Sequence, residues 1–373
     1  MKHLWILLIL ALFLLGGCTT QTSLKLYTKT SLDCGFDTFC TLSAYTENEE
    51  TFNQYYDLMV EEYQHYHKLF DIYHEYPDLH NLKTINDNAG IKPIDVEKPI
   101  IDMLNYAKSV NDITGGNFDI TSGALLSVWH EYREAGQALN ANNQLGNLPT
   151  LEELEAASKL SGYEHLLINE DNQTVYLDVK GMRIDVGAIG KGYATEMVAL
   201  KLKEAGLEYG AVNGGGNQRL IGTKANDDLW NVGIANPMPS SVQNDSLVAI
   251  IKDLKDCAIV TSGDYQNYYL GPDNKSYAHI IDLKTLYPAN YYHSVSIVTS
   301  DSGLADCLST AIFALEYHEG QALIENLKNQ YNLDIGVVYV SSQPLDETSV
   351  RALSQAELYV TYTDNLKDQI TYQ

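Results

Sequence analysis

The sequence has few basic residues, and this shortage excludes one broad class of function. Lysine and arginine together number 24, against 49 aspartate and glutamate residues, so the formal net charge is −25. Nucleic-acid phosphates are bound by clustered Lys and Arg side chains. We therefore expect no nucleic-acid partner. An anionic ligand would need a local positive charge or a bound cation.

Cysteines are scarce, and their spacing does not suit a zinc or thioredoxin-like site. None of the five cysteines forms a C-x-x-C pair, so neither kind of site has support. Cys34 and Cys40 could pair in an oxidising compartment. They could equally be small buried side chains. The sequence leaves the redox state of Cys34, Cys40, Cys257 and Cys307 open.

Internal repeats and low-complexity linkers are also absent. With 373 residues and a hydrophobic content of 45%, the chain can bury a sizeable core in one large domain or two smaller ones. The candidate boundary is the polar stretch 133–149, which we predict to be a surface loop. The motifs below lie on both sides of it, so we expect one α+β domain with two lobes.

The N-terminal segment is predicted to be a targeting signal and not part of the folded domain. Residues 4–15 are apolar but too few for a normal membrane-spanning helix. Leu15-Gly16-Gly17-Cys18 looks like a bacterial lipobox, in which Cys18 carries lipid; an uncleaved anchor or an ordinary signal peptide is the alternative. We predict a signal peptide over 1–17, a tether over 18–26 and a domain over 27–373. The mature protein would then be lipid-anchored on the extracytoplasmic face of the membrane.

Local patterns predict most of the helices and strands. The 3.6-residue period or capping signals indicate helices, and alternation indicates strands. The predicted helices are 51–70, 99–114, 123–132, 151–160 after a capping box at Thr150 and Glu153, 194–205 and 303–315. The predicted strands are 39–45, 166–168, 175–177, 182–186, 209–212, 218–222, 230–234, 247–251, 279–282 and an edge strand at 356–361.

The stretch 185–193, D-V-G-A-I-G-K-G-Y, is the feature around which the chain is organised. An apolar run, 182–186, leads into it, and the helical pattern 194–205 follows and stops at Gly206. Strand, glycine loop and helix in this order make an anion site, because free N–H groups and the positive end of the helix dipole face the ligand. Lys191 adds a formal charge. The stretch fits neither the dinucleotide fingerprint nor the Walker pattern, so alone it is a weak signal.

Four further blocks follow in order and make the signal specific. They are V-N-G-G-G-N at 212–217, C-A-I-V-T-S-G-D-Y at 257–265, Y-A-H-I-I-D-L-K-T-L-Y-P at 277–288 and A-D-C-L-S-T-A-I-F at 305–313. With the glycine-rich stretch, these blocks resemble the FAD:protein FMN transferase family, the ApbE-like flavin transferases, over about 36–340. Upstream, N-F-D-I-T at 117–121 is similar to the family's G-x-F-D-I-T block. Phe36-Asp37-Thr38 stands where the family usually has Met-Gly-Thr, and only Thr38 matches.

The resemblance implies a fold, a reaction and a set of site residues. The fold would be a two-lobed α+β domain with the FAD cleft between the lobes. The reaction would be Mg²⁺-dependent transfer of FMN from FAD to a Thr or Ser hydroxyl of a separate acceptor flavoprotein, with release of AMP. The implied residues are His279, Asp306 and Lys191 for catalysis; Tyr73, Asn117, Phe118, Asp119, Asp185, Ala188, Lys191, Gly215, Gly216, Thr261, Ser262, His279 and Ile281 for FAD; and the Ala188 carbonyl, Asp306, Ser309 and Thr310 for Mg²⁺.

Several of these residues also have plainer interpretations. Asp306 and Thr310 share one helix face and suit Mg²⁺, but they could be a first-turn acid and a core hydroxyl. His279 could be a general base or a satisfied core residue. Asp119 could cap the helix that begins at residue 123, and Asp185 could be a plain turn acid.

Three other functions remain open at this point. A hydrolase would use the same site with water as the nucleophile and split FAD into FMN and AMP. A lipoprotein that only binds flavin, or a solute-binding lipoprotein, would need neither a metal nor a base. The Asp306, Thr310 and His279 side chains favour an enzyme. No segment matches the acceptor signature of flavinylated proteins well, so the acceptor would be another protein.

Overall fold

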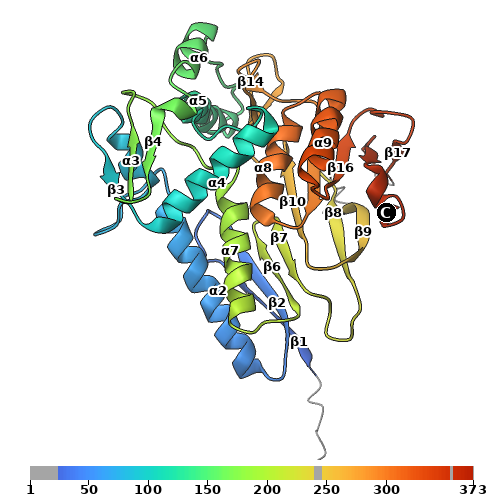
Figure 1. Ribbon diagram of the computed structural model, residues 1–373. Helices are drawn as coiled ribbons and strands as arrows, with labels where there is room; N and C mark the ends of the chain where they lie inside the picture. The colour runs from blue at the N-terminus through green and yellow to red at the C-terminus, as the bar shows by residue number, and fades with distance from the viewer. Residues whose placement is uncertain (1–23, 239–245, 353–355, 373) are drawn as a thin grey trace, which may run out of the picture.

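The computed structural model describes residues 24–238, 246–352 and 356–372, and a nine-stranded sheet runs through it (Figure 1). Every neighbouring pair of strands is antiparallel, in the order β1-β2-β6-β7-β10-β15-β16-β18-β17. The strands are β1 Lys25–Ser31, β2 Cys40–Thr46, β6 Gly210–Gly214, β7 Asn217–Ile221, β10 Ala258–Gly263, β15 Ser294–Thr299, β16 Gly336–Ser341, β17 Val350–Arg351 and β18 Tyr359–Tyr362. The expected edge strand at 356–361 appears as β18, but it is not an edge strand, since it lies between β16 and β17.

Helices cover one face of this sheet. Helix α2 (Glu49–Phe70) lies beside α7 (Gly190–Glu204), and α7 packs in turn on α8 (Ser302–Phe313) (Figure 1). The aromatic stripe of α2 is core, as its spacing predicts: Phe52 and Tyr63 are buried. Helices α4 (Lys98–Thr114) and α9 (Tyr317–Tyr331) complete this layer beside α8.

A small sheet covers the opposite face. It consists of β8 (Trp230–Ala235), β9 (Leu247–Leu254) and β19 (Ile370–Tyr372). In β16, Val337 and Tyr339 pack under the helices, while Val338 and Val340 pack with β8 and β9, as the two-residue period of a strand requires. The strands expected at 230–234 and 247–251 therefore exist, but they cover the main sheet instead of extending it.

Most of the remaining elements lie beside α4, α5 (Gly123–Asn140) and α8, and the 3₁₀ turn Asp364–Leu366 packs with the small sheet on the opposite face. Besides α5, the remaining elements are α3 Leu82–Asp87, α6 Leu151–Ser158, β3 Ile94–Asp95, β4 Leu166–Asn169, β5 Thr174–Leu177, β11 Tyr268–Leu270, β12 Ser276–Ala278, β13 Ile281–Asp282, β14 Tyr287–Pro288 and the 3₁₀ turns Tyr163–His165 and Asp364–Leu366. The β4–β5 hairpin and the Thr150–Glu153 capping box are confirmed.

The surface-loop prediction for 133–149 is wrong over its first half, because α5 continues to Asn140. A packing contact explains the length of this helix. Gly136 lies against the Tyr269 ring, and a Cβ at Gly136 would come within 2.3 Å of it. The Tyr269 ring covers the helix at Gly136, which is buried. The residues around Gly136 are polar, so the sequence alone does not reveal this contact.

Two predicted strands are not formed as expected: the strand predicted at 182–186 is not part of a sheet, and the one predicted at 279–282 is reduced to β13, Ile281–Asp282. Residues 182–186 are extended but belong to no sheet; the Asn86 amide instead bonds both the N–H and the C=O of Ile184, at 2.7 and 2.9 Å. On its other side the segment pairs with only a short stretch of backbone: Arg183 forms an isolated parallel bridge with Ser122, and the Asp185 N–H donates to the Ile120 carbonyl at 2.9 Å. His279 lies in the turn between β12 and β13, not within a strand.

The N-terminal predictions fall mostly outside the described residues. The signal peptide and Cys18 belong to residues 1–23, which the structure does not describe. Strand β1 begins at Lys25 and pairs along its whole length with β2, so it takes the last two residues of the segment predicted as a tether. Among the described helices, none is both long and apolar enough to cross a membrane.

Candidate functional site

One cavity collects the residues of all the sequence blocks. Its volume is about 400 Å³, within the range of about 300–1,000 Å³ typical of small-molecule sites. The predicted residues that line it are Tyr73, Asn117, Phe118, Asp119, Asp185, Ala188, Lys191, Gly215, Thr261, Ser262, His279, Ile281, Asp306 and Thr310. Gly216 and Ser309 do not line it.

The glycine-rich stretch is divided between a turn at 187–189 and the first turn of α7. The helix begins at Gly190, and Lys191 lies in its first turn at the cavity wall. At Gly192 the two helices α7 and α8 touch: a Cβ there would lie 2.4 Å from both Asp306 Cβ and the Ser302 carbonyl oxygen. Only glycine lets the backbone approach this closely. The contact brings the Gly192 N–H to 2.8 Å from Asp306 Oδ2.

Asp306 is a buried carboxylate with an altered pKa. Burial raises its pKa to about 6, while the Lys191 charge and the Gly192 N–H act in the opposite direction. Thr310 lies one turn further along α8 and lines the same cavity, as the four-residue spacing predicts. Ser309 points elsewhere: its Oγ bonds Ser262 Oγ at 2.7 Å and the Asp306 carbonyl at 2.9 Å. Ser309 therefore supports Ser262, which lines the cavity, and does not face the cavity itself.

This donor set fits a magnesium ion. Mg²⁺ is usually held by one or two carboxylates, with water and substrate phosphate oxygens completing its shell. Asp306 offers an oxygen, Oδ1, that accepts no hydrogen bond from the described residues, and Thr310 and Ala188 lie on the same cavity. No group of three His, Cys, Asp or Glu residues that could hold a metal occurs within 24–238, 246–352 and 356–372. A site here would depend on Asp306 as its carboxylate.

His279 is placed to act as a neutral base. Its ring is exposed to the cavity, yet protein atoms surround it on the sides away from the opening. This desolvation, together with the Arg133 and Lys191 charges, lowers its pKa to about 4. An imidazole with a lowered pKa carries no proton at neutral pH and can accept one. The plain alternative of a buried core histidine is excluded by its position on the cavity.

Two of the predicted aspartates on the cavity wall, Asp119 and Asp185, form local turns. Asp119 Oδ1 accepts from the N–H and the hydroxyl of Thr121, both at 2.7 Å. It does not cap α5, whose N-cap residue is Ser122. Asp185 Oδ1 accepts from the Gly187 N–H at 2.8 Å. Burial raises the pKa of both carboxyls.

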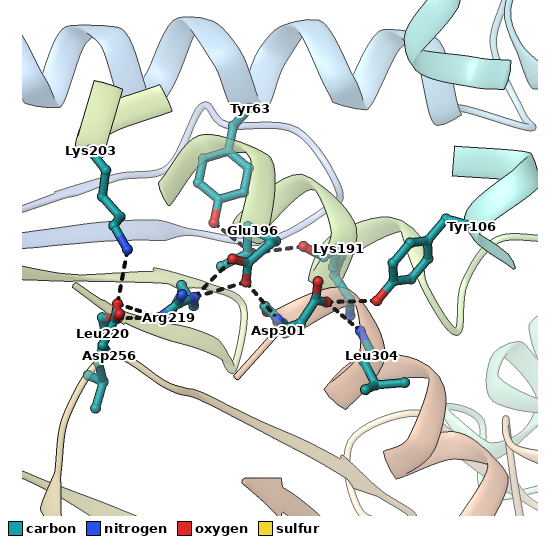
Figure 2. Close-up of polar contacts among 12 residues, drawn as sticks. Tyr63, Tyr106, Lys191, Glu196, Lys203, Arg219, Leu220, Asp256, Asp301 and Leu304 are labelled. Carbon is teal, nitrogen blue, oxygen red and sulfur yellow. Dashed lines mark hydrogen bonds and ion pairs between the residues drawn. The ribbon is translucent and has the colours of Figure 1, made fainter. Parts of the chain in front are cut away.

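A buried ion-pair network holds α7 and α8 together next to the site (Figure 2). Arg219 Nε donates to both oxygens of Glu196, at 3.1 and 2.9 Å, and both side chains are only 6% exposed. Glu196 also accepts from the Ser302 N–H at 2.7 Å, at the start of α8. Figure 2 shows the outer end of the network, where Asp256 bridges Arg219 and Lys203.

The comparison with known families decides the identity of this arrangement. The model of the ApbE family matches residues 36–333. The chain belongs to the ApbE family. The resemblance in the sequence blocks is thereby confirmed.

Individual ApbE proteins agree. A Vibrio cholerae protein named FAD:protein FMN transferase is 32% identical over 245 residues, covering 65% of this chain and 69% of that protein. A Treponema pallidum protein of the same name is 30% identical over 257 residues, covering 65% and 67%. The solved structure of the flavin transferase ApbE from Vibrio cholerae superposes with a TM-score of 0.70 at 25% identity, covering 93% of this chain and 99% of that one. The ApbE protein of Thermotoga maritima gives 0.68 at 27% identity, covering 84% and 94%. The predicted α+β fold is therefore confirmed as an ApbE fold.

Sequence reasoning missed a cation of this ApbE site. Arg133 lines the cavity, and its Nε is buried without a hydrogen-bond partner among the described residues. Its Nη2 lies 2.9 Å from His130 Nδ1. Desolvation lowers its pKa. The polar composition around it indicated a loop, so the sequence gave no signal that Arg133 would face a ligand. Other polar lining residues without a prediction include Asp37, His67, His130, Asn217 and Asn267.

Proposed function

We propose that this chain transfers FMN from FAD to a Thr or Ser hydroxyl of an acceptor flavoprotein and releases AMP. It is an FAD:protein FMN transferase, as its relatives of 30–32% identity are. One observation carries the proposal for the site: a base, a buried carboxylate and cationic side chains line the same cavity, although up to about 170 residues separate them in sequence. They are His279, Asp306, Lys191 and Arg133.

Magnesium would be held by Asp306, Thr310 and the Ala188 carbonyl. Bound there, the ion would neutralise charge on the pyrophosphate oxygens of FAD. This assignment rests on the chemistry of the donors: a carboxylate, a hydroxyl and a carbonyl are the oxygen ligands that Mg²⁺ prefers. Among them only Asp306 carries charge, so we expect metal affinity to depend most on this residue.

The residues of the chain would act on both sides of the reacting phosphorus. The acceptor hydroxyl oxygen forms a bond to the FMN-side phosphorus, and the bond from this phosphorus to the AMP oxygen breaks. His279 takes the hydroxyl proton; its lowered pKa in the free protein leaves the ring neutral, and so free to accept a proton, at neutral pH. Lys191 and the N–H groups at the start of α7 would stabilise the charge on the phosphoryl oxygens. FMN remains on the acceptor as a phosphoester.

We also propose that the enzyme works outside the cytoplasmic membrane, anchored by lipid on Cys18. The lipobox-like sequence before Cys18 supports this location. So does the disulfide between Cys34 and Cys40, since such bonds persist in oxidising compartments. Metabolic labelling with a fatty acid, lost on Cys18→Ala, would test the anchor; unchanged labelling would rule it out.

The reaction is tested with the purified full chain, FAD, Mg²⁺ and a flavoprotein acceptor domain. We expect the acceptor to gain the mass of one esterified FMN while AMP appears, and both to stop on addition of EDTA. Free FMN with AMP and an unlabelled acceptor would instead indicate a hydrolase. Intact FAD in every arm would reduce the protein to a flavin-binding one.

A matched pair of variants on α8 tests the metal assignment. Asp306→Asn keeps the shape of the side chain but removes its charge, and we expect at least about a hundredfold loss of turnover. Ser309→Ala removes a neighbouring hydroxyl that bonds Ser262 but does not itself line the cavity, and we expect a smaller loss of turnover than in Asp306→Asn, with the dependence on Mg²⁺ concentration unchanged. Full activity of Asp306→Asn would remove Asp306 from the site.

A further inference from the structure

A seven-residue loop closed by the Cys34–Cys40 disulfide forms part of the cavity wall. We call residues 34–40 the disulfide loop. Both cysteines are buried and their Cα atoms are 6.2 Å apart. Phe36 and Asp37, at the middle of the loop, line the cavity. The loop therefore places two side chains on the cavity that the proposed function assigns to FAD, and the inference below rests on that function.

The backbone of this loop is in a conformation that it would not keep unaided. Gly35, Phe36 and Asp37 have φ values of +80°, +55° and +50°. The left-handed region is unfavourable for residues with a Cβ, and Phe36 is a bulky example. Two consecutive non-glycine residues there need outside support. The disulfide supplies part of it, because it fixes both ends of the loop.

His67 of α2 supplies a second part. The Phe36 N–H donates to His67 Nδ1 at 3.0 Å, and the two rings meet edge to face with centroids 5.3 Å apart. Gly35 lies so close that a Cβ would come within 2.2 Å of His67 Cγ. The loop thus packs against the His67 imidazole. Nδ1 of this ring must be unprotonated, because it accepts the hydrogen bond from the Phe36 N–H.

The same imidazole connects the loop to the segment that carries Tyr73. With Nδ1 accepting, the ring proton lies on Nε2, which is 3.3 Å from Tyr76 Oη. Tyr76 donates to Asp71 Oδ2 at 2.8 Å. Asp71 Oδ1 accepts from the N–H groups of Tyr73 at 2.6 Å and His74 at 3.0 Å. The bonds from Phe36 through His67 and Tyr76 all donate toward Asp71, and Asp71 accepts from the Tyr73 side as well.

The loop also contacts the glycines of the site. The Gly215 N–H donates to the Phe39 carbonyl at 3.0 Å, and Thr38 lies so close to Gly215 that a Cβ there would be 2.4 Å from its hydroxyl oxygen. Phe36 Cε1 would be 3.7 Å from a Cβ at Gly190, at the start of α7. The loop therefore touches the glycine turn, the first turn of α7 and, through His67, the Tyr73 segment.

We propose that the disulfide loop is a positioning element for FAD and that His67 couples it to the Tyr73 segment. Phe36 and Tyr73 both line the cavity, and aromatic side chains suit a large flat ring such as the flavin. The disulfide and His67 hold these two side chains in their binding conformation before the ligand arrives. None of these groups takes part in bond formation, so their effect belongs to FAD binding.

The test compares three changes in the full chain. His67→Leu removes both hydrogen bonds; His67→Gln keeps an acceptor for Phe36 and a donor for Tyr76; Cys34→Ala with Cys40→Ala opens the loop. Affinity for FAD is measured by flavin fluorescence in EDTA, where no turnover occurs, and KM and kcat are measured with Mg²⁺ and acceptor. Cys257→Ala, which removes a free cysteine outside the loop, is the control.

We expect His67→Leu and the double cysteine variant each to weaken FAD binding roughly tenfold. KM for FAD should rise by a similar factor, and kcat should stay within about threefold of the parent. His67→Gln should restore most of the affinity. The combination of His67→Leu with the cysteine changes should cost less than the sum of the two, because both loosen one loop.

Other results would overturn the inference. Equal loss for His67→Leu and His67→Gln, a fall in kcat with unchanged KM, or fully additive losses would each mean that the loop does not position FAD through His67. If the cysteine variant does not fold, the His67 pair still decides the question. A parent chain that neither binds FAD nor labels an acceptor would refute the proposed function, whereas an active parent with unaffected variants would refute only this inference.

Discussion

At the scale of single residues, two cations shape the chemistry of the cavity, and only one of them has a sequence signal. Lys191 belongs to the glycine-rich block, while Arg133 follows no motif. Both charges lower the pKa of His279, after the larger effect of desolvation. The buried Nε of Arg133 has no partner among the described residues. A buried donor without a partner is costly, so a ligand oxygen is the group that would satisfy it.

Replacement of Arg133 should separate its charge from its hydrogen bond. In Arg133→Leu, we expect FAD affinity to fall about tenfold to a hundredfold, since charge-assisted hydrogen bonds contribute about 1.5–3 kcal/mol. The pKa of His279 should rise toward its ordinary value, because a nearby positive charge is gone. Arg133→Lys should keep the low pKa but not the full affinity, since lysine lacks the Nε donor.

Fluorescence titration with FAD and NMR of ¹³C-labelled histidine measure the two effects. In the parent, the His279 signal should stay constant from pH 8 to about pH 5.5, because a base whose pKa is lowered takes up its proton only in more acidic solution. In Arg133→Leu, the signal should begin to shift at higher pH. An unchanged titration in Arg133→Leu would mean that desolvation alone lowers the pKa.

At the scale of elements, the site depends on the junction between α7 and α8. Gly192 permits the contact, and the buried pair of Glu196 and Arg219 fixes it. Burial raises the pKa of Glu196, and Arg219 and the Ser302 N–H counteract this. Helix α7 carries Lys191, and helix α8 carries Asp306. A change in the angle between α7 and α8 would therefore move the cation away from the carboxylate.

The buried pair gives a prediction for stability. Glu196→Gln removes the buried carboxylate that pairs with Arg219 and leaves this arginine the half-exposed Asp256 as a charged partner. We expect a loss of about 3–5 kcal/mol in the free energy of unfolding. Lys203→Met breaks the half-exposed pair with Asp256 in the same network, and should cost only about 0–1 kcal/mol. Urea denaturation of both variants measures the difference. Similar losses in the two variants would mean that burial of the pair is not what matters.

Elements with their own local signal were predicted well, and elements defined by distant contacts were not. The α2 stripe, the β4–β5 hairpin and the Thr150–Glu153 capping box follow from periodicity and turn chemistry. The extension of α5 depends on the Tyr269 ring, more than a hundred residues away. The run 182–186 has the composition of a strand, but its backbone bonds the Asn86 side chain on one side and only an isolated bridge at Ser122 on the other.

The candidate site shows the same division. Asp306, Thr310 and His279 belong to ordered blocks, so their residue types and spacing indicated a shared site. Arg133 and His67 reach the cavity only because α5 and α2 pass beside it. Their neighbours in sequence are ordinary helix residues. No local pattern could have singled them out, because their role comes from the packing of elements.

At the scale of the whole molecule, the strong negative charge opposes the binding of an anionic substrate. The net charge is −25, and the pyrophosphate gives FAD negative charge as well. Lys191 and Arg133 counteract this field only within the cavity, because charges in water act over about 10 Å at an ionic strength of 0.1 M. Encounter with FAD takes place outside that range, where the overall repulsion dominates.

We therefore expect added salt to favour FAD binding. Between about 20 and 200 mM NaCl, at saturating Mg²⁺, KM for FAD should fall severalfold while kcat changes little, because screening weakens long-range repulsion more than contacts inside the cavity. Riboflavin, which has no phosphate, serves as the control, and its inhibition constant should stay nearly constant. A KM that rises with salt would mean that Lys191 and Arg133 dominate the field that FAD meets. In that case Arg133→Leu should remove much of the salt dependence of KM. One series of measurements therefore distinguishes the effect of the overall negative charge from that of the cations in the cavity.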